Sequence, residues 1–364
     1  MSVAEFVRDY WQQRPVLLRG VFPPDFCPLD GDDVLVLAGR EEADSRLIIS
    51  EEWPPELLHG PFEPEDLEDL PDEEWTVLVQ EVDRLVPEAA RVLEAFRFIP
   101  NWRVDDLMVS WAAPGGGVGA HTDQYDVFLI QGLGHRRWEI ETTANPDPEW
   151  RPDSEVAVLA SFEPDAVWEL EPGDVLYLPP HVAHNGIALT PCITLSVGFR
   201  APSAAEVLED AVAYLNESRS GTSRTVVAGS TSDPGRIGDD VLRRLREQVR
   251  ALLAEDEQLD RFIARSLTEP ARGRSAGLEE DYLEMLPERG VVEPVSAAQA
   301  AYFVSGDAVL LVVGGRLWSL PLEASADVAA LTGPSGLRLR PDLDAGLRGI
   351  LEELAADGTL RRRG

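Results

Sequence analysis

The chain has 364 residues, enough for two or three domains, and at 44% hydrophobic and 27% charged it has the composition of a globular protein, which excludes a disordered one. It carries 66 acidic residues against 32 basic ones, all of them Arg, for a formal net charge of −34. Such a surface repels phosphate backbones, so we expect no direct nucleic-acid contact, whereas a basic partner would be attracted. The simpler explanation of the lysine-free acidic surface is solubility in high salt, which screens the self-repulsion.

Cysteine usage and the first residues bear on the location of the protein. Cys27 and Cys192 are far apart and provide no disulfide framework, which is typical of a reducing cytosol. The first residues include Glu5 and Asp9 and lack the apolar stretch of a signal peptide. No run approaches the roughly 20 apolar residues of a membrane span. The sequence therefore predicts a cytoplasmic protein with no membrane contact.

The first hundred residues give few structural signals. A short helix that ends before Pro15 is predicted by four apolar residues at helical spacing, Val3, Phe6, Val7 and Tyr10. Residues 20–100 are rich in Pro, Asp and Glu and contain helical patches such as Glu81–Phe96. The order of the remaining elements in this segment does not follow from the pattern.

Residues 105–200 have a different sequence pattern, in which short apolar or alternating runs are separated by Gly and Pro. Six of these runs predict strands: Leu107–Ala112, Asp126–Gln131, Arg137–Ile140, Val167–Leu170, Asp174–Leu178 and Ile193–Phe199. Because no long helix intervenes, we expect an antiparallel sandwich or barrel.

A helical region is predicted next. Ser203 and Glu206 form a capping-box pattern before apolar residues at helical spacing, and a loop over Ser218–Arg236 follows. The second helical stretch, Asp239–Leu267, has an apolar stripe that includes Val241, Leu242, Leu245, Val249, Leu252 and Leu253. We expect these helices to pack on the barrel or across a dimer axis.

The C-terminal part follows a linker over Glu269–Gly277 and predicts a small α+β segment. Strands at Ala308–Val313 and Arg316–Pro321 flank a Gly-Gly pair, which is a hairpin signal. A helix from Asp342 to about residue 356 is predicted to end at Asp357-Gly358.

Three residues have the pattern of a metal site. His121 and Asp123 lie two apart, so on a strand both side chains would face into the barrel. His184 follows a turn, a buried strand and a Pro pair that would direct it inward. Two His and one carboxylate form the facial triad of non-haem iron(II) oxygenases, which leaves three positions open for cosubstrate and oxygen. His181 is interpreted as an exposed or outer residue, and His135 and His59 as solvent-facing.

Further residues near these motifs fit cosubstrate binding. A dicarboxylate needs a fixed cation, and either Arg136 or Arg137 would face inward by strand alternation. Thr194 and Ser196 alternate on a predicted strand and would add hydroxyl donors, or be structural. The glycine-rich segment 114–119 predicts a flexible loop that lets the backbone approach a ligand.

Several stretches together resemble one family. Residues 115–132, with Arg136-Arg137-Trp138, are similar to the bacterial ribosomal oxygenases, and so are residues 173–180, His184 and residues 196–202. The resemblance implies an α+β fold with a double-stranded β-helix barrel (cupin, Jumonji C). It implies a catalytic domain at 1–202 with N-terminal helical elements, a helical dimerisation region at 203–270 and a winged-helix-like C-terminal domain at 271–364.

The resemblance also implies a function. Members of this family use Fe(II), 2-oxoglutarate and O2 to hydroxylate an arginine of a large-subunit ribosomal protein, the one numbered sixteen. His121, Asp123 and His184 would be the iron ligands, and Arg136 would bind 2-oxoglutarate. Near the mouth, Tyr125 and Asp126 are candidates for contact with the cationic substrate, or for core positions.

Other functions are also compatible with these residues. The same chemistry would serve hydroxylation of a histidine or demethylation of a methyl-lysine on another protein. A cupin without metal would be a binding module only, although such a module has no use for an intact triad with Arg136. We expect a homodimer, and a C-terminal domain that docks ribosomal protein rather than DNA because of the acidic charge.

Overall fold

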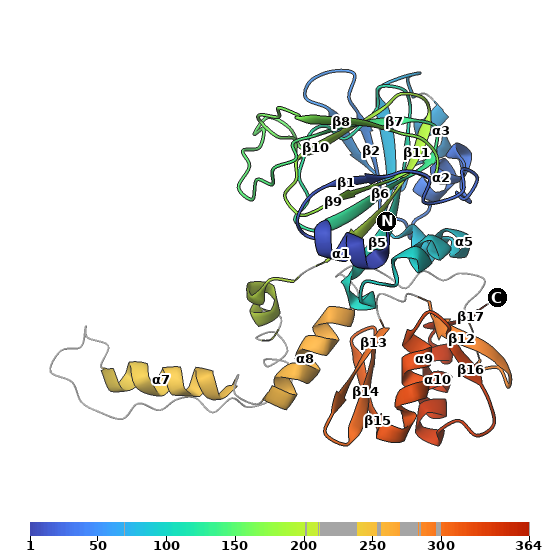
Figure 1. The fold of residues 1–364 in the computed structure, drawn as a ribbon, viewed down its shortest axis with the longest axis vertical. Helices are drawn as coiled ribbons and strands as arrows, with labels where there is room; N and C mark the ends of the chain where they lie inside the picture. The colour runs from blue at the N-terminus through green and yellow to red at the C-terminus, as the bar shows by residue number, and fades with distance from the viewer. Residues whose placement is uncertain are drawn as a thin grey trace.

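The computed structural model describes residues 1–68, 70–200, 202–209, 211, 239–252, 256–269, 283, 285–295 and 300–363. Residues 1–200 form a β-rich unit, and residues 283–363 form a smaller α+β unit beside it (Figure 1). Between them in sequence, α7 (Asp239–Leu252) projects away from both units, and α8 (Asp256–Thr268) lies along the smaller one. In the described part of the chain, no helix combines the length and the apolar character that crossing a membrane requires.

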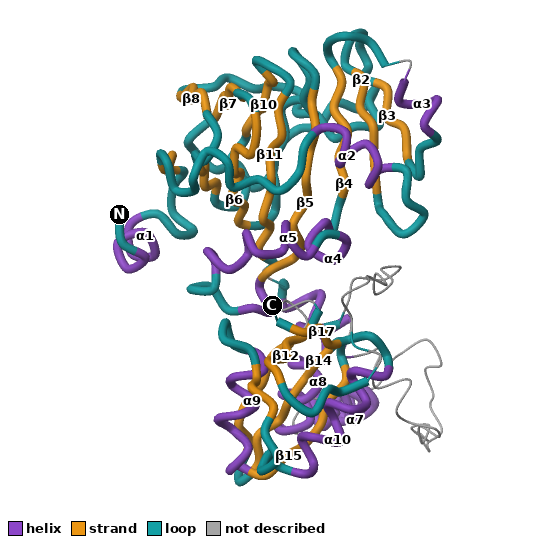
Figure 2. Tube along the Cα trace, turned by 90° about the vertical axis from the view of Figure 1, so that its right-hand side faces the viewer, coloured by secondary structure: helices purple, strands orange, loops and turns teal. Residues whose placement is uncertain are grey.

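The β-rich unit is built on a large antiparallel sheet in the order β1-β9-β6-β11-β5-β4-β2-β3. Its strands are β1 (Val16–Leu18), β2 (Ser45–Ile49), β3 (Glu56–His59), β4 (Trp75–Val79), β5 (Val104–Ala112), β6 (Asp126–Leu133), β9 (Val175–Leu178) and β11 (Cys192–Phe199). A second antiparallel sheet has the order β10-β7-β8, with β7 (Arg136–Ile140), β8 (Ala166–Leu170) and β10 (His184–Ala188). The two sheets face each other, which confirms the expected barrel (Figure 2).

Strand alternation divides the large sheet into two faces. On β11, Ile193, Leu195 and Val197 belong to the main apolar core, whereas Thr194 and Ser196 line the barrel interior. The core therefore lies on the outer face, where it is covered by short helices. These are α1 (Val3–Asp9), α2 (Gly31–Ala38), α3 (Pro64–Glu68), α4 (Val82–Leu85), α5 (Pro87–Ala90) and η1 (Arg91–Phe96), whereas η2 (Asn101–Arg103) has no buried residue and contacts α8. Each large apolar side chain buried there contributes roughly 1.5–3 kcal/mol.

The N-terminal segment differs in detail from the expectation. The predicted first helix is present as α1, but only Phe6 of its apolar face is buried, while Val3 and Val7 are exposed. The helical patch at Glu81–Phe96 is present as three short pieces, α4, α5 and η1. Strands β2, β3 and β4 had no counterpart in the sequence prediction, and they extend the large sheet beyond the barrel strands.

The helical region is confirmed where the structure describes it. Glu206 donates its backbone N–H to Ser203 Oγ at 3.2 Å, and Ser203 donates its own to a Glu206 carboxylate oxygen at 2.6 Å, which is the predicted capping box. The predicted helix at Asp239–Leu267 corresponds to α7 and α8. The predicted loop at Ser218–Arg236, Leu253 and most of the linker lie outside the described residues. The dimerisation role of this region stays a prediction.

The C-terminal unit has two three-stranded antiparallel sheets, β16-β12-β17 and β13-β14-β15, with helices α9 and α10. Its elements are β12 (Gly290–Pro294), β13 (Ala300–Ser305), β14 (Ala308–Val313), β15 (Arg316–Pro321), η4 (Leu322–Ala324), α9 (Ser325–Thr332), β16 (Leu337–Leu339), α10 (Ala345–Ala356) and β17 (Leu360–Arg362). Gly314 and Gly315 have φ of 55° and 73° and close the predicted hairpin. The winged-helix-like description and the domain limits stay predictions.

Candidate active site

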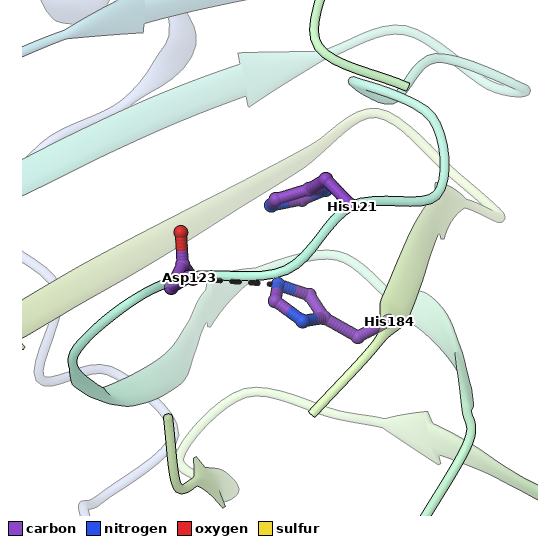
Figure 3. A group of neighbouring side chains, drawn as sticks. All are labelled: His121, Asp123 and His184. Atoms are coloured by element: carbon purple, nitrogen blue, oxygen red, sulfur yellow. Dashed lines mark ion pairs between the residues drawn. The ribbon is translucent and has the colours of Figure 1, made fainter. Parts of the chain in front are cut away.

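The predicted metal ligands lie together in the barrel. His121, Asp123 and His184 each offer a ligand atom, and these atoms lie within 4.8 Å of one another. His184 Nε2 is 3.6 Å from a carboxylate oxygen of Asp123, and the two imidazole rings are 4.2 Å apart at their centroids (Figure 3). Two imidazoles and a carboxylate around one space are a donor set that suits non-haem iron(II).

Backbone pairing fixes two of the three residues relative to each other. His184 opens β10, and it exchanges two backbone hydrogen bonds with His121, at 2.9 and 3.0 Å. His121 is an isolated bridge residue and Asp123 lies in the following loop, so the expectation that both lie on one regular strand is wrong. The loop is held instead by the backbone N–H of His181, which donates to the carbonyl oxygen of Asp123 at 2.7 Å.

Both imidazoles are oriented by a second contact of the ring. The Nδ1 of His121 lies 2.9 Å from the carbonyl oxygen of Gly119, and the Nδ1 of His184 lies 2.9 Å from that of Val182. With the proton on Nδ1, each ring directs the lone pair of Nε2 toward the shared space. Burial, together with the nearby His121, lowers the pKa of His184 to about 4, so this ring is neutral near pH 7, the form a metal binds.

The other histidines stay outside this group. The Pro pair and His181, whose φ is 66°, make the turn that brings His184 inward, as the sequence predicted. His181 itself is half-buried and contributes its backbone, while its ring is not part of the ligand group. His135 and His59 are exposed as predicted, although His59 ends a strand, β3, instead of lying in a loop.

The triad opens onto a cavity of 360 Å³ inside the barrel. Polar and charged side chains from several strands reach it: Arg46, Gln80, Asp106, Ser110, Tyr125, Arg136, Thr194 and Ser196. The cavity is large enough for a small cosubstrate beside the end of a long side chain.

Strand alternation decides between the two candidate arginines. Arg136 is 4% exposed and lines the cavity, while Arg137 is half-buried and pairs with Glu139 at 3.4 Å. Within the described residues, Nε and one terminal nitrogen of Arg136 are buried and make no hydrogen bond. Its guanidinium lies 5.7 Å from the Trp138 ring centroid. A buried cation without an acceptor is costly, so this arrangement fits a site that receives an anion.

The two substrate candidates differ in position. Tyr125 is 36% exposed and lines the cavity, and burial, with the nearby Asp123, raises the pKa of its hydroxyl. Asp126 is fully buried on the other face of β6, where it accepts hydrogen bonds from Tyr177 at 2.6 Å and Gln12 at 3.0 Å. The structure therefore places Asp126 in the packing of the N-terminal segment, away from the cavity, which is the core position that the sequence left open for one of the two residues.

The glycine-rich loop packs closely against neighbouring backbone, and its approach to a ligand stays a prediction. A Cβ on Gly116 would lie 2.1 Å from the carbonyl oxygen of Trp75, and one on Gly117 would lie 2.3 Å from that of Gly186. Gly186 itself lies against the Trp138 ring, where a Cβ would be 2.6 Å from ring carbons. The glycines thus let the loop pack against neighbouring backbone, which supports the segment leading to His121.

Sequence reasoning missed three charged residues of the cavity. Asp106 lies on β5, just before the predicted strand, and continuing its alternation through Met108 and Ser110 would have found it. Arg46 and Glu155 also line the cavity, but they lie in segments whose fold had no clear pattern.

Two known proteins are similar in sequence to part of this chain. It is 41% identical over 211 residues to the ribosomal protein uL16 3-hydroxylase of Escherichia coli, and 36% identical over 208 residues to a probable ribosomal oxygenase of Haemophilus influenzae. These alignments cover 58% and 56% of this chain, and 56% and 51% of the two relatives. The chain thus matches about half the length of each.

Solved structures match over nearly the whole chain. YcfD, a ribosomal oxygenase from E. coli, in complex with cobalt and succinic acid is 30% identical, with a TM-score of 0.78 over 100% of this chain and 99% of that one. The same protein with cobalt and 2-oxoglutarate is 29% identical, with a TM-score of 0.79 over 100% and 99%.

Residues 91–207 match the JmjC domain family. The barrel, with its His-Asp-His group at the interior, is therefore a JmjC-class catalytic fold. The similarity to YcfD extends over nearly the whole chain and identifies one family within this class. The chain belongs to the bacterial ribosomal oxygenases.

Proposed function

We propose that this protein is an iron(II)- and 2-oxoglutarate-dependent oxygenase that hydroxylates an arginine side chain of the large-subunit ribosomal protein uL16. The observation that carries the proposal is the cavity that joins the His121, Asp123 and His184 group to the unpartnered guanidinium of Arg136. The relative from E. coli is named for 3-hydroxylation of uL16, which supports the choice of substrate.

Three residues would hold the metal, and others would orient the cosubstrate. His121, Asp123 and His184 would occupy one face of an octahedral iron(II) and leave the other face open. Arg136 would bind the far carboxylate of 2-oxoglutarate through its fork of N–H donors, and the buried hydroxyls of Thr194 and Ser196 line the same cavity. Iron(II) with 2-oxoglutarate and O2 supplies the oxidising power needed to insert oxygen into an unactivated C–H bond.

The cavity favours a cationic substrate. Asp106 is a carboxylate 8% exposed within it, and Tyr125 flanks the opening with a protonated hydroxyl. A guanidinium gains more from these groups than a neutral imidazole does, which favours arginine over histidine. We further propose that the protein acts as a cytoplasmic homodimer on a basic ribosomal protein, in keeping with its net charge of −34.

The test combines ligand binding with turnover. Iron(II) and 2-oxoglutarate binding are measured without oxygen, and an arginine-containing uL16 peptide is then incubated in air and analysed by mass. A gain of one oxygen atom on arginine, lost in Asp123→Ala and kept in His135→Ala, supports the proposal. Binding of both ligands without oxidation of the peptide contradicts the choice of substrate, and absence of metal binding contradicts the enzyme itself.

A further inference from the structure

A hairpin-like segment lies between β7 and β8 and is called here the arm, residues 147–160. Backbone hydrogen bonds join its two halves, from Arg151 N–H to the Val158 carbonyl and from Ala160 N–H to the Glu149 carbonyl, both at 2.8 Å. Only a single bridge, Trp150 to Leu159, gives it sheet character. The arm is therefore a defined structure although no regular strand was predicted there.

The base of the arm is tied to the metal-ligand segment. Leu159 donates its backbone N–H to the Ala120 carbonyl at 2.8 Å, one residue before His121. Next to this bond, a Cβ on Gly119 would lie 3.0 Å from the Val158 side chain, so the two segments are in close contact. The position of the arm is thus coupled to the wall of the site.

The tip of the arm is joined to the β2–β3 turn by three side chains. Trp53 Nε1 donates to a carboxylate oxygen of Asp153 at 3.0 Å, and Arg151 donates to both carboxylate oxygens of Asp153, each at 3.0 Å. The Arg151 guanidinium also lies 4.2 Å from the Trp53 ring centroid. The Arg151 and Trp53 hydrogen bonds lower the pKa of Asp153, so the carboxylate stays charged. We call this group of three the latch.

Between base and tip, the arm packs on the large sheet. Val156 and Val158 of the arm form an apolar cluster with Ile48 of β2, and all three are less than 10% exposed. On the cavity side of this cluster the arm places Glu155, an exposed residue that nevertheless lines the cavity. Arg46 of β2 and Leu57 of β3 line the same cavity.

We propose that Glu155 contacts a cationic side chain of the substrate at the cavity mouth, and that Trp53, Arg151 and Asp153 are positioning residues that act through the arm. The inference rests on the proposed function, because it concerns the substrate of the same cavity. Of the charged side chains that line this cavity, Arg46 would repel a cation, whereas Glu155 on the arm would attract one. Within the latch the charges of Arg151 and Asp153 compensate each other, which leaves Glu155 as the carboxylate of the arm that lines the cavity.

Peptide binding tests the contact without relying on catalysis. The full-length protein is titrated against a fluorescent arginine-containing uL16 peptide and against the same peptide with citrulline, a neutral isostere, at every arginine. We expect Glu155→Gln to raise Kd for the arginine peptide about fivefold and to leave Kd for the citrulline peptide unchanged. Glu149→Gln, the same change on the other half of the arm and away from the cavity, serves as the matched control.

The role of the latch is tested by combining Trp53 substitutions with Glu155→Gln and measuring Kd for the peptide. Trp53→Ala removes both the N–H donor and the ring, and Trp53→Phe removes the donor alone. We expect Trp53→Ala to raise Kd for the arginine peptide about fivefold and Trp53→Phe less, with no further loss on adding Glu155→Gln. Hydrogen exchange of residues 149–160 should be faster in Trp53→Ala, again about fivefold.

The outcomes separate the inference from the proposed function. An unchanged Kd in Glu155→Gln, an equal change for the citrulline peptide, or additive effects of Trp53→Ala and Glu155→Gln would overturn the inference. So would failure of the wild-type protein to bind the peptide while it still converts 2-oxoglutarate. Charge-dependent binding with the expected pattern but no oxidation of the peptide would support the inference and contradict the proposed reaction.

Discussion

The two faces of the large sheet use the same strands for opposite purposes. The outer face is apolar and covered by helices, with Leu195 and Phe128 packed among aromatic rings. The inner face holds buried hydroxyls, a buried carboxylate and, across the barrel, an unpaired guanidinium. The main apolar core is therefore on one face, and the polar lining of the cavity is on the other, beside a smaller apolar cluster between the two sheets, because successive side chains of a strand point to opposite sides. Substitutions on the two faces should separate stability from recognition.

The largest effect is expected for the metal ligands on the inner side. Asp123→Ala removes the one carboxylate of the ligand group, while its side chain takes no part in the apolar core. We expect metal-dependent turnover to fall by more than the roughly 100-fold that loss of an outer partner of a ligand costs. Succinate formation and cobalt(II) absorption measure the effect. Retention of metal binding in Asp123→Ala, or an equal loss in His135→Ala, would contradict the assignment.

A substitution that creates a cavity in the core on the outer face should have the opposite effect, a loss of stability without a loss of ligand binding. Leu195 is fully buried in the core, so Leu195→Ala should lower the free energy of unfolding by about 2–5 kcal/mol. The affinity for 2-oxoglutarate should stay close to that of the wild type below the melting temperature. Denaturant unfolding and ligand titration on one preparation check both. A large loss of affinity in a folded Leu195→Ala protein would show that the faces are not independent.

A substitution of Arg136 should change the affinity for 2-oxoglutarate and the free energy of unfolding in opposite directions. Because its buried guanidinium has unpaired donors, Arg136→Met should raise the free energy of unfolding of the ligand-free protein by about 1–2 kcal/mol. The same change should weaken 2-oxoglutarate binding about 100-fold, since a buried charge contact with the far carboxylate is lost. Thermal unfolding and calorimetric titration measure the two effects. Arg137→Met is the control, and a similar loss there would reverse the assignment of the two arginines.

The smallest effect is expected at a helix cap over the outer face. The Asp30 side chain accepts a hydrogen bond from the backbone N–H of Asp33 at 3.0 Å, and the Asp33 side chain accepts one from the backbone N–H of Asp30 at 2.9 Å, which closes the N-terminus of α2. Asp30→Ala should lower the free energy of unfolding by about 1 kcal/mol without changing turnover. Chemical denaturation with a parallel activity assay gives both values. A loss of turnover with unchanged stability would be inconsistent with the separation of the two faces.

The barrel strands were predictable because each carries local information. Alternation and Gly or Pro punctuation gave β5, β6, β7, β8, β9 and β11 to within a few residues. The strands β2, β3 and β4 were not predictable, because Pro and acidic residues surround them and because the β2–β3 pair joins the large sheet only through β4 and the more distant β5. The arm was missed for the same reason. Its conformation depends on contacts with Ala120 and Trp53, which no local pattern reveals.

The candidate site was predictable in its chemistry and only partly in its geometry. The residue types at His121, Asp123 and His184 were sufficient to suggest a metal group, and the structure brings them together. The choice between Arg136 and Arg137 needed the register of β7 against β10, which places Arg136 opposite Ala188 and inward. Tyr125 continues the inward alternation of Val127 and Leu129, and Asp126 lies on the other face; the sequence showed this alternation but not which of the two faces was inward.

The paired backbone of His121 and His184 has a consequence for how this fold tolerates change. His121 and His184 come from distant segments and share one rung of sheet, so we expect thermal motion to displace them together and to change their separation little. A register slip of one residue would point either neighbour, Ala120 or Thr122, where the ring now lies. Insertions are therefore expected to be excluded from that rung, whereas changes of length are expected to be tolerated in the exposed loops between the barrel strands.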